Sequence, residues 1–184
     1  MFASANRLPE DARSKIADEL NLCLADGLDL YSQIKTAHWN VKGPHFAALH
    51  RLFDEFAASV TEHDDEIAER AVALGALARG TVGNAAEASR LSEYPEVLTR
   101  DLEHVALLAE RFEKALDGLR TARDVAELNE DVDTVDLLTG IVTEYEKHGW
   151  MLKATLEGGE DDARERAAQQ HATERTKRGA AARA

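Results

Sequence analysis

Four side chains that commonly bind metal ions are symmetrically spaced in one stretch of this sequence. They are His50, Asp54, Asp65 and Glu69, and the steps between them are four, eleven and four residues. Each residue of an α-helix turns by about 100°, so a step of eleven residues returns a side chain to within roughly 20° of its starting direction. If the stretch is helical, all four side chains share one stripe.

The stripe is too long for a metal ion bound by a single chain. At about 1.5 Å of rise per residue, Asp54 and Asp65 are about 16 Å apart along the helix axis, whereas metal–ligand distances are about 2–2.5 Å. A second copy of the helix, antiparallel across a two-fold axis near Ser59 and Val60, would bring the first half of the stripe opposite the second half. The spacing therefore predicts a metal site shared between two subunits of an isologous dimer.

The ligand types narrow the choice of metal. Imidazole and carboxylate groups together suit iron, zinc or manganese better than magnesium or calcium. Bundles with an internal di-iron site carry Glu-x-x-His motifs on two helices of one chain, and this sequence contains no Glu-x-x-His. That absence again favours a site between chains. The alternative interpretation is a solvated helix face with surface histidines, because acidic residues recur at helical spacing on many exposed faces.

The composition is typical of one globular, helical domain. The chain has 184 residues, 44% of them hydrophobic and only three of them proline, which suits a substantial core. No run of about 18 apolar residues is present, so no membrane-spanning helix is expected, and residues 1–13 lack the apolar centre of a signal peptide. The single cysteine, Cys23, lies among leucines and predicts a buried, unreactive thiol. We expect a cytoplasmic protein.

The net charge of −13 is large for a chain of this size. It opposes general binding to nucleic acid and to anionic membranes, and it favours the uptake of cations or life in high salt. Arginine also outnumbers lysine. An acidic surface with few lysines resembles that of proteins from extreme halophiles, so the sequence predicts a halophilic source. An ordinary acidic soluble protein is the alternative.

The elements that must position these residues are four long helices. Apolar residues at helical spacing predict helices over residues 10–38, 45–74, from Pro95 to a turn at 129–131, and 132–156. A short helix from Asn84, as its cap, to about Arg90 is expected in the middle connection. The predicted fold is therefore all-α, a four-helix bundle with a short extra helix in the middle crossover.

The last predicted helix ends at a pair of glycines, Gly158 and Gly159. This boundary divides the chain into a bundle domain, residues 1–159, and a polar C-terminal tail, residues 160–184. The tail contains almost no large apolar side chain, so it has little to bury against the bundle. We expect it to be mobile.

One stretch of the sequence closely resembles a known family. Residues 36–75 read TAHWNVKGPHFAALHRLFDEFAASVTEHDDEIAERAVALG. They contain the HWN, the Gly and Phe after it, the LH and the D-x-x-A-E-R-x-x-x-L-G run of the Dps family, the ferritin-like DNA-binding proteins from starved cells. Residues 133–152 resemble the fourth helix of the same family through D-T-x-D and K-H-x-W elements. The resemblance spans residues 12–156 and implies a ferritin-like four-helix bundle.

The resemblance also implies an activity and an assembly. Family members form hollow homododecamers that oxidise Fe(II), commonly with hydrogen peroxide, and store ferric mineral inside. Their ferroxidase ligands lie at the dimer two-fold axis. Carried over by motif, the ligands of one subunit are His38, His50 and Asp54, and those of the other subunit are Asp65 and Glu69. Trp39 would lie beside the iron, with core packing as its other role.

The resemblance also predicts roles in iron entry and mineral nucleation for further acidic residues. In the family, acids at the start of the fourth helix line a three-fold pore. The matching residues here are Asp131, Asp133 and Asp136, of which the last is the best candidate. Three copies of each would attract Fe(II), whereas the alternative is simple stabilisation of a helix N-terminus. The candidates for mineral nucleation on the cavity wall are Glu55, Glu62 and Glu66.

The sequence departs from the DNA-binding members in its basic residues. Those members carry a Lys-rich N-terminal tail or another basic extension, whereas the N-terminal segment here has only Arg7, Arg13 and Lys15. We therefore expect no DNA binding, and we expect an iron-storing ferroxidase that protects DNA indirectly. Two alternatives stay open: a nucleoid-associated DNA-binding structural protein, and a metal buffer without redox turnover.

Overall fold

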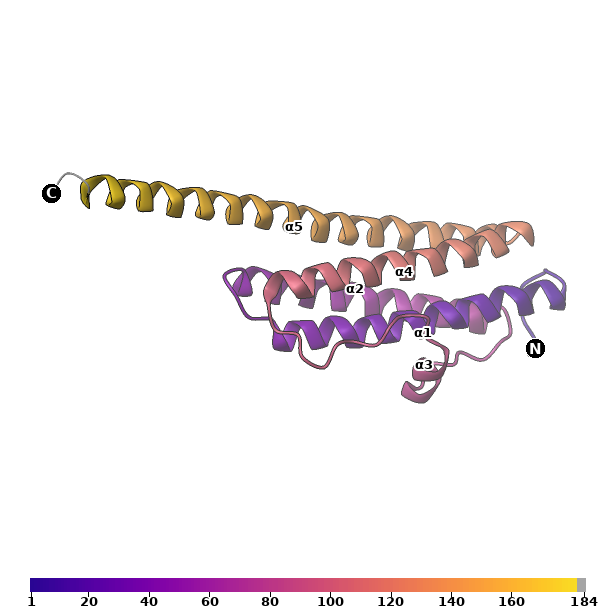
Figure 1. Cartoon of the computed structure of the whole chain (residues 1–184). Coiled ribbons are helices and arrows are strands. Elements are labelled where there is room, and N and C mark those ends of the chain that lie inside the picture. The colour runs from indigo at the N-terminus through magenta and orange to yellow at the C-terminus, as the bar shows by residue number, and fades with distance from the viewer. Residues whose placement is uncertain (182–184) are drawn as a thin grey trace.

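Four long helices pack side by side in the computed structural model, which describes the backbone of residues 1–181 and the side chains of residues 1–158. In chain order the elements are α1 (Glu10–Asn40), α2 (Phe46–Ala73), α3 (Val82–Ala88), α4 (Asp101–Leu128) and α5 (Val132–Ala181). The short α3 lies outside the bundle, within the long crossover from α2 to α4 (Figure 1). The predicted all-α bundle with a short extra helix in the middle crossover is confirmed.

The core is built from apolar residues at helical spacing on the long helices. α1 packs mainly against α2 and α4, and α4 packs against α5. Phe53 and Phe56 of α2 and Phe112 of α4 are almost fully buried, and the rings of Phe56 and Phe112 meet edge to face with centroids 5.6 Å apart. Burying a side chain of this size stabilises the fold by about 1.5–3 kcal/mol. Because the apolar face of α2 points inward, its stripe of metal-binding residue types stays outside.

The third long helix begins later than the sequence predicted. α4 starts at Asp101 rather than at Pro95, and the residues before it are not helical. The crossover is held along α1 instead, where the Gln33 side chain donates to the carbonyl of Ser92 at 3.0 Å. Such side-chain contacts satisfy backbone groups of the crossover that would otherwise be hydrogen-bonded within an additional turn of helix. Tertiary structure therefore overrides the local helix signal of the proline.

The start of the short helix also differs from the prediction. α3 begins at Val82, and its cap is Thr81, whose hydroxyl accepts the backbone N–H of Asn84 at 3.2 Å. Asn84, the predicted cap, lies inside the helix and accepts a hydrogen bond from the Thr81 hydroxyl at 2.7 Å. Threonine and asparagine are both common cap residues, so sequence preference alone did not separate these neighbouring positions.

The last helix does not end at the predicted pair of glycines. α5 continues through Gly158 and Gly159 to Ala181, and in Figure 1 it runs well past the other helices. Each glycine costs a helix only about 1 kcal/mol relative to alanine, and the residues that follow are rich in alanine, glutamate and arginine. The side chains of the predicted tail lie outside the described residues. No helix in the described part of the chain is long and apolar enough to cross a membrane.

The N-terminal segment is attached to the far end of α2. The Phe2 N–H donates to the carbonyl of Gly75 at 2.7 Å, and the Ser4 hydroxyl donates to the carbonyl of Ala73 at 2.6 Å. Gly75 has φ +94°, and a Cβ at this position would lie 2.6 Å from the Phe2 carbonyl oxygen. Only glycine fits there without strain, and it allows the first residues to be bound to the bundle.

Candidate metal centre

Two histidines meet where α1 ends and α2 begins. His38 lies in the last turn of α1 and His50 near the start of α2, and their half-buried rings stack with centroids 3.7 Å apart. Nδ1 of His38 lies 2.7 Å from the carbonyl oxygen of His50, and Nδ1 of His50 lies 2.9 Å from the carbonyl oxygen of His38. A carbonyl oxygen only accepts, so each Nδ1 carries the hydrogen and donates it. In the neutral tautomer that donates from Nδ1, each ring keeps its lone pair on Nε2, where a metal ion can bind.

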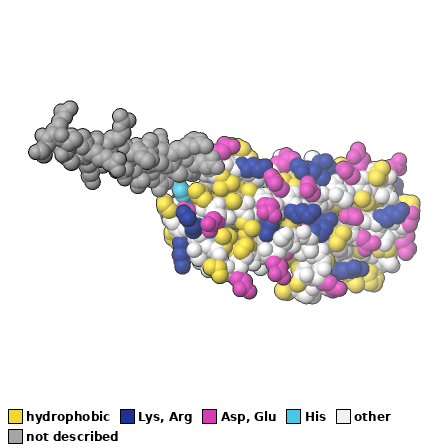
Figure 2. Space-filling model, viewed as in Figure 1, with side chains coloured by type: hydrophobic (Ala, Val, Ile, Leu, Met, Phe, Trp, Pro, Cys, Tyr) yellow, Lys and Arg dark blue, Asp and Glu magenta, His cyan; other side chains and the backbone are white. Residues whose placement is uncertain are grey.

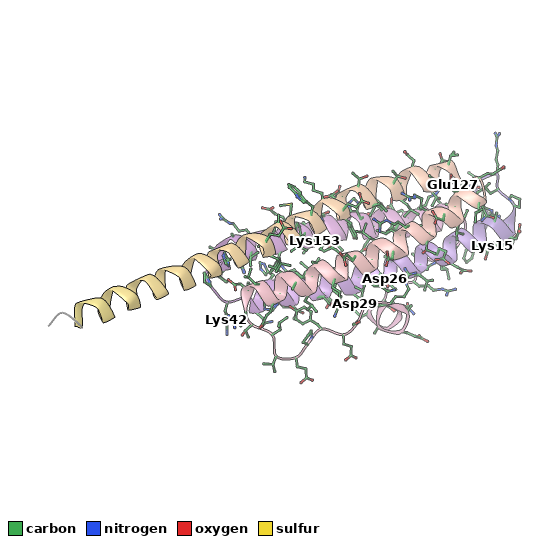
Figure 3. All side chains as sticks on the ribbon, turned by 45° about the horizontal axis from the view of Figure 1, so that its top comes forward. Lys15, Asp26, Asp29, Lys42, Glu127 and Lys153 are labelled. Carbon is green, nitrogen blue, oxygen red and sulfur yellow. The ribbon has the colours of Figure 1, made fainter. Side chains whose placement is uncertain are left out.

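The connection between these histidines is fixed by the start of α4. His45 donates its backbone N–H to Asp101 Oδ2 at 3.0 Å, and its Nδ1 lies 2.9 Å from the same oxygen. Gly43 has φ +148°, and a Cβ there would lie 2.4 Å from the Asp101 carboxylate, so the close approach requires glycine. Lys42, in the same connection, lies at the opposite end of the bundle from Glu127 (Figure 3). The histidine pair and the predicted pore region are therefore far apart on one chain.

Asp54, the third predicted ligand of this subunit, is bound to a lysine of its own chain. Lys35 Nζ lies 2.6 Å from Asp54 Oδ1, and the lysine side chain is only 18% exposed. The hydrogen bond from Lys35, followed by its positive charge, lowers the pKa of Asp54, and the two neighbouring histidines add to the effect. The Lys35 ammonium also lies 5.9 Å from the centre of the Trp39 ring. A metal ion must compete with this ammonium for Asp54.

Sequence reasoning missed Lys35, although one signal was present. It lies three residues before His38, on the same helical face. Trp39 is 69% exposed, so the alternative of core packing is wrong for the single chain. Its ring covers surface beside Lys35 instead.

Asp65 and Glu69 are not brought to the histidines within one chain. Both side chains are exposed on α2, and neither forms a hydrogen bond or an ion pair with another described residue. Across residues 1–158, where side chains are described, no three histidine, cysteine or acidic side chains form a group able to hold a metal ion. Within one subunit the predicted ligands therefore form two separate groups, one around His38 and His50 and the other at Asp65 and Glu69 further along α2.

The predicted pore acids have two different environments. Asp131 is 3% exposed and binds Arg70 Nη2 of α2 at 2.6 Å through Oδ1. Its Oδ2 accepts the Thr134 hydroxyl at 2.6 Å, and its side chain lies at the start of α5, as the capping alternative predicted. Asp133 and Asp136 are exposed. The exposed pair is accessible on the single chain, whereas Asp131 is engaged inside the bundle.

A second polar cluster connects α2 to α5 and was not predicted. Nδ1 of His63 lies 2.9 Å from Glu66 Oε2, and its Nε2 lies 2.9 Å from Glu144 Oε2. The Ser59 hydroxyl donates to Glu144 Oε1 at 2.8 Å. The hydrogen bond from Ser59, and after it the hydrogen bond and the charge of His63, lower the pKa of Glu144 despite partial burial. Glu66, a predicted nucleation residue, is therefore already bound to His63.

Asp64 is a buried carboxyl group beside a predicted ligand, and sequence reasoning missed it. It is 5% exposed, and neither of its oxygens has a hydrogen-bond partner among the described residues. The group packs onto Gly27 of α1, where a Cβ would fall 1.7 Å from Asp64 Oδ1. Burial raises the pKa of Asp64 to about 8. The one feature of the sequence that could have indicated a buried Asp64 is its position on the side of α2 that otherwise packs against α1.

Comparison with known proteins agrees with this architecture. The pattern that defines the ferritin-like domain family matches residues 17–161, so the chain is a ferritin-like protein. The DNA protection during starvation protein of Agrobacterium fabrum is 36% identical over 152 residues, which cover 83% of this chain and 94% of that protein. The chain therefore belongs to the Dps family of ferritin-like proteins.

Two solved structures extend the comparison. The Dps protein from Vibrio cholerae O1, described as a member of a broad superfamily of ferritin-like diiron-carboxylate proteins, has a TM-score of 0.79 at 27% identity and covers 85% of this chain and 99% of its own. The archaeal Dps homologue from Halobacterium salinarum has a TM-score of 0.80 at 27% identity and covers 84% of this chain and 86% of its own. Likeness to a protein from a halophile does not identify a source, so the halophilic origin stays a prediction.

Proposed function

We propose that this protein oxidises Fe(II) at sites shared between two subunits and stores the ferric product inside a hollow homododecamer. Membership of the Dps family supports iron storage and the protection of DNA from oxidative damage. The diiron-carboxylate superfamily named for the Vibrio cholerae relative supports iron as the metal. The observation that carries the proposal is the reciprocal pair of hydrogen bonds between His38 and His50, which supports both imidazole groups as metal ligands through Nε2.

The site takes its remaining ligands from the second subunit. His38, His50 and Asp54 form one half, and Asp65 and Glu69 form the other. The symmetric spacing on α2 supports this division, as does the exposure of the two acids without partners among the described residues. Next to the midpoint of the spacing, which falls between Ser59 and Val60, Ala58 is exposed, so two copies of α2 can approach closely there.

Each residue type has a distinct chemical role in this proposal. Carboxylates neutralise the charge of the metal and favour the ferric product, while imidazoles are borderline ligands that suit Fe(II). Lys35 holds the Asp54 carboxylate in place before iron arrives and must release it as Fe(II) binds. Hydrogen peroxide is the proposed oxidant, so that Fe(II) and peroxide are removed together. Asp133 and Asp136, exposed at the start of α5, are the proposed entry residues for Fe(II).

The test uses two variants that damage opposite halves of the site. One variant carries His50→Ala and Asp54→Ala, and the other carries Asp65→Ala and Glu69→Ala. Each variant alone damages every shared site, so rapid Fe(II) oxidation is lost. In a mixed dimer, one site carries all four substitutions and the other carries none. Co-assembled shells should therefore recover on the order of one intact site in four after random mixing.

The measurement is the rate of ferric absorbance after peroxide is added to Fe(II)-loaded shells. Mass spectrometry of intact dimers confirms that the two variants have mixed. A site built within one chain gives no recovery, because every chain is then defective. Co-assembled shells no faster than the separate variants, with mixed dimers present, overturn the shared-site proposal. A matched control co-assembles the first variant with a chain that carries His50→Ala, Asp54→Ala and Asp18→Ala, and it should give no recovery because exposed Asp18 on α1 belongs to neither half.

A further inference from the structure

A groove between α4 and α5 lies on helices that carry none of the predicted ferroxidase ligands. Its volume is about 590 Å³, and its lining includes Leu116 of α4 and Gly149 of α5. A Cβ at Gly149 would meet no atom within 4 Å, so the groove is open above this residue. Trp150 also lines the groove and is 66% exposed. An open groove beside an exposed tryptophan is typical of an interaction surface.

The groove carries more negative than positive charge. Four carboxylates and two cations line it, and both cations are already paired within the chain. Arg120 Nη2 lies 2.9 Å from Glu146 Oε1, and Lys153 Nζ lies 2.5 Å from Glu113 Oε1. Glu157 is exposed, and it forms no ion pair with another described residue. The groove therefore attracts a cationic partner rather than an anionic one.

The C-terminal segment of the chain has the complementary charge. Its last ten residues, 175–184, contain four basic and no acidic side chain. Arginine and lysine bind carboxylates, and they also stack on the face of tryptophan, the best cation–π partner among the side chains. The segment has no large apolar residue, so any contact with a groove depends on these basic groups and their aliphatic stems.

The course of α5 carries this segment away from the groove of its own subunit. Leu156 is the last described side chain of α5 that packs against the core, and the helix then runs past the other helices (Figure 1). Lys153, which lines the groove, lies on α5 before that point (Figure 3). A single helix outside a bundle has no neighbour to pack against and is marginally stable in water. Its contact surface must therefore come from another subunit.

We propose that the groove between α4 and α5 binds the basic C-terminal segment, residues 175–184, of a neighbouring subunit. One basic side chain covers a face of the Trp150 ring, and others pair with Glu157 and the remaining carboxylates of the groove. The contact links neighbouring subunits and engages basic residues that would otherwise be available to phosphates. The inference needs an assembly of subunits but not iron oxidation, so it can fail while the proposed ferroxidase activity stands.

The test measures how accessible Trp150 is in assembled shells. The chain has two tryptophans, so W39F leaves Trp150 as the only one, and acrylamide quenching of its fluorescence reports its exposure. Replacing the four basic residues of the segment by alanine in W39F should raise the quenching constant about twofold, because docking covers one face of the ring. Molar salt should raise it similarly in W39F shells by screening the ion pairs. The four replaced residues are Arg175, Lys177, Arg178 and Arg183.

Matched controls separate this contact from a general effect of charge. R164A/R166A, added to W39F, removes two basic residues from the same tail but outside the last ten, and it should leave the quenching constant unchanged. On the groove side, Glu157→Gln should raise the constant. Asp124→Asn should leave it unchanged, because exposed Asp124 of α4 does not line the groove. Glu157→Gln keeps the test decisive if the four-alanine variant assembles poorly.

Co-assembly shows which subunit supplies the segment. One chain carries W39F and the four alanines, so it has Trp150 but no basic segment. The other carries W39F/W150F, so it has the basic segment but no tryptophan. In shells mixed with an excess of the second chain, all tryptophan emission comes from the first chain. Its quenching constant should fall towards that of W39F shells, and mass spectrometry of intact shells confirms the mixing.

Several outcomes overturn the inference. One is an equal quenching constant in W39F shells with and without the four basic residues, which shows that the segment does not cover Trp150. Another is protection of Trp150 in W39F shells that does not return on co-assembly, which places the segment on its own subunit. A chain that stays monomeric in size-exclusion chromatography overturns both this inference and the proposed dodecamer. Intact shells that oxidise Fe(II) but leave Trp150 uncovered overturn this inference alone.

Discussion

Two aspartates on the same helix show how strongly local surroundings change one residue type. Asp54 is exposed and bound by Lys35, and its pKa is lowered mainly by that hydrogen bond. Asp64 is buried against Gly27 without a partner among the described residues, and its pKa is raised to about 8 by burial alone. A carboxylate held by a cation is ready to exchange that cation for a metal ion, whereas a buried neutral acid is not. The chemistry of α2 therefore depends on which side of the helix an acid occupies.

The buried acid gives a prediction about pH. An aspartate in an unfolded chain has a pKa of about 3.9. Between about pH 4 and pH 8 the folded protein therefore keeps a proton at Asp64 that the unfolded chain has lost. Stability therefore falls as pH rises through this range, by at most about 1.4 kcal/mol per pH unit for one group. Asp64→Asn removes the titrating group. At pH 8 we expect the free energy of unfolding of the variant to be larger than that of the wild type by roughly 1–3 kcal/mol. Denaturant melts across pH measure this difference.

Asp18→Asn is the control for the pH prediction, because Asp18 is exposed on α1, and its removal should leave the pH profile unchanged. A variant of Asp64 that is less stable than the wild type at every pH would contradict the prediction. It would show that a neighbouring subunit supplies the hydrogen-bond partner that the single chain lacks.

At the scale of the elements, α2 and α5 are joined by a buried ion pair at the start of α5. Arg70 donates to Asp131 Oδ1 at 2.6 Å and to the Thr134 hydroxyl at 2.7 Å. The same Asp131 accepts the Thr134 N–H at 3.3 Å, as an N-terminal cap does. The neighbouring acids of α5, Asp133 and Asp136, make no such contacts within the described residues. One short segment therefore combines a structural acid with acids that are available to a passing cation.

This division predicts different effects for two similar substitutions. Asp131→Ala leaves Arg70 half-buried and unpaired, and we expect it to destabilise the chain by about 2–4 kcal/mol. Asp136→Asn, on the exposed side, should leave the melting temperature unchanged but slow Fe(II) oxidation in assembled shells. Thermal melts and stopped-flow absorbance distinguish the two effects. Equal loss of stability in both variants would show that Asp136 also has a structural role in the assembly.

Local patterns predicted the parts of this molecule that depend on helical periodicity. The apolar face of α2 around Phe53 and Phe56 and the opposite stripe from His50 to Glu69 follow from residue spacing alone. Lys35 was missed because a lysine one turn before a histidine is common on solvated helices. The remaining features depend on contacts between residues distant in sequence, which no local pattern encodes. Those features are the Asp131–Arg70 pair, the late start of α4 and the close packing of the Asp64 carboxyl group on Gly27.

At the scale of the whole molecule, the surface carries both signs of charge. Acidic and basic side chains are interspersed over the face of the bundle in Figure 2, while the chain as a whole has a net charge of −13. The N-terminal residues are hydrogen-bonded to the end of α2 through Phe2 and Ser4. Basic N-terminal arms bind DNA by neutralising phosphates; the basic residues of this segment are only Arg7, Arg13 and Lys15, so we expect no such binding.

The last prediction concerns DNA and tests the nucleoid alternative directly. The basic residues near the C-terminus are Arg175, Lys177, Arg178 and Arg183. In an assembled shell they act against the field of many acidic subunits, and their attraction to phosphates weakens steeply as salt rises. We expect no stable complex with duplex DNA at physiological salt, either for the full chain or for a variant that lacks residues 160–184. Gel-shift assays at graded salt provide the measurement, with the truncated shell as the control. Complexes that form with the full chain at physiological salt and vanish on truncation would show that the tail overrides the net charge, and would make DNA binding a second function of this protein.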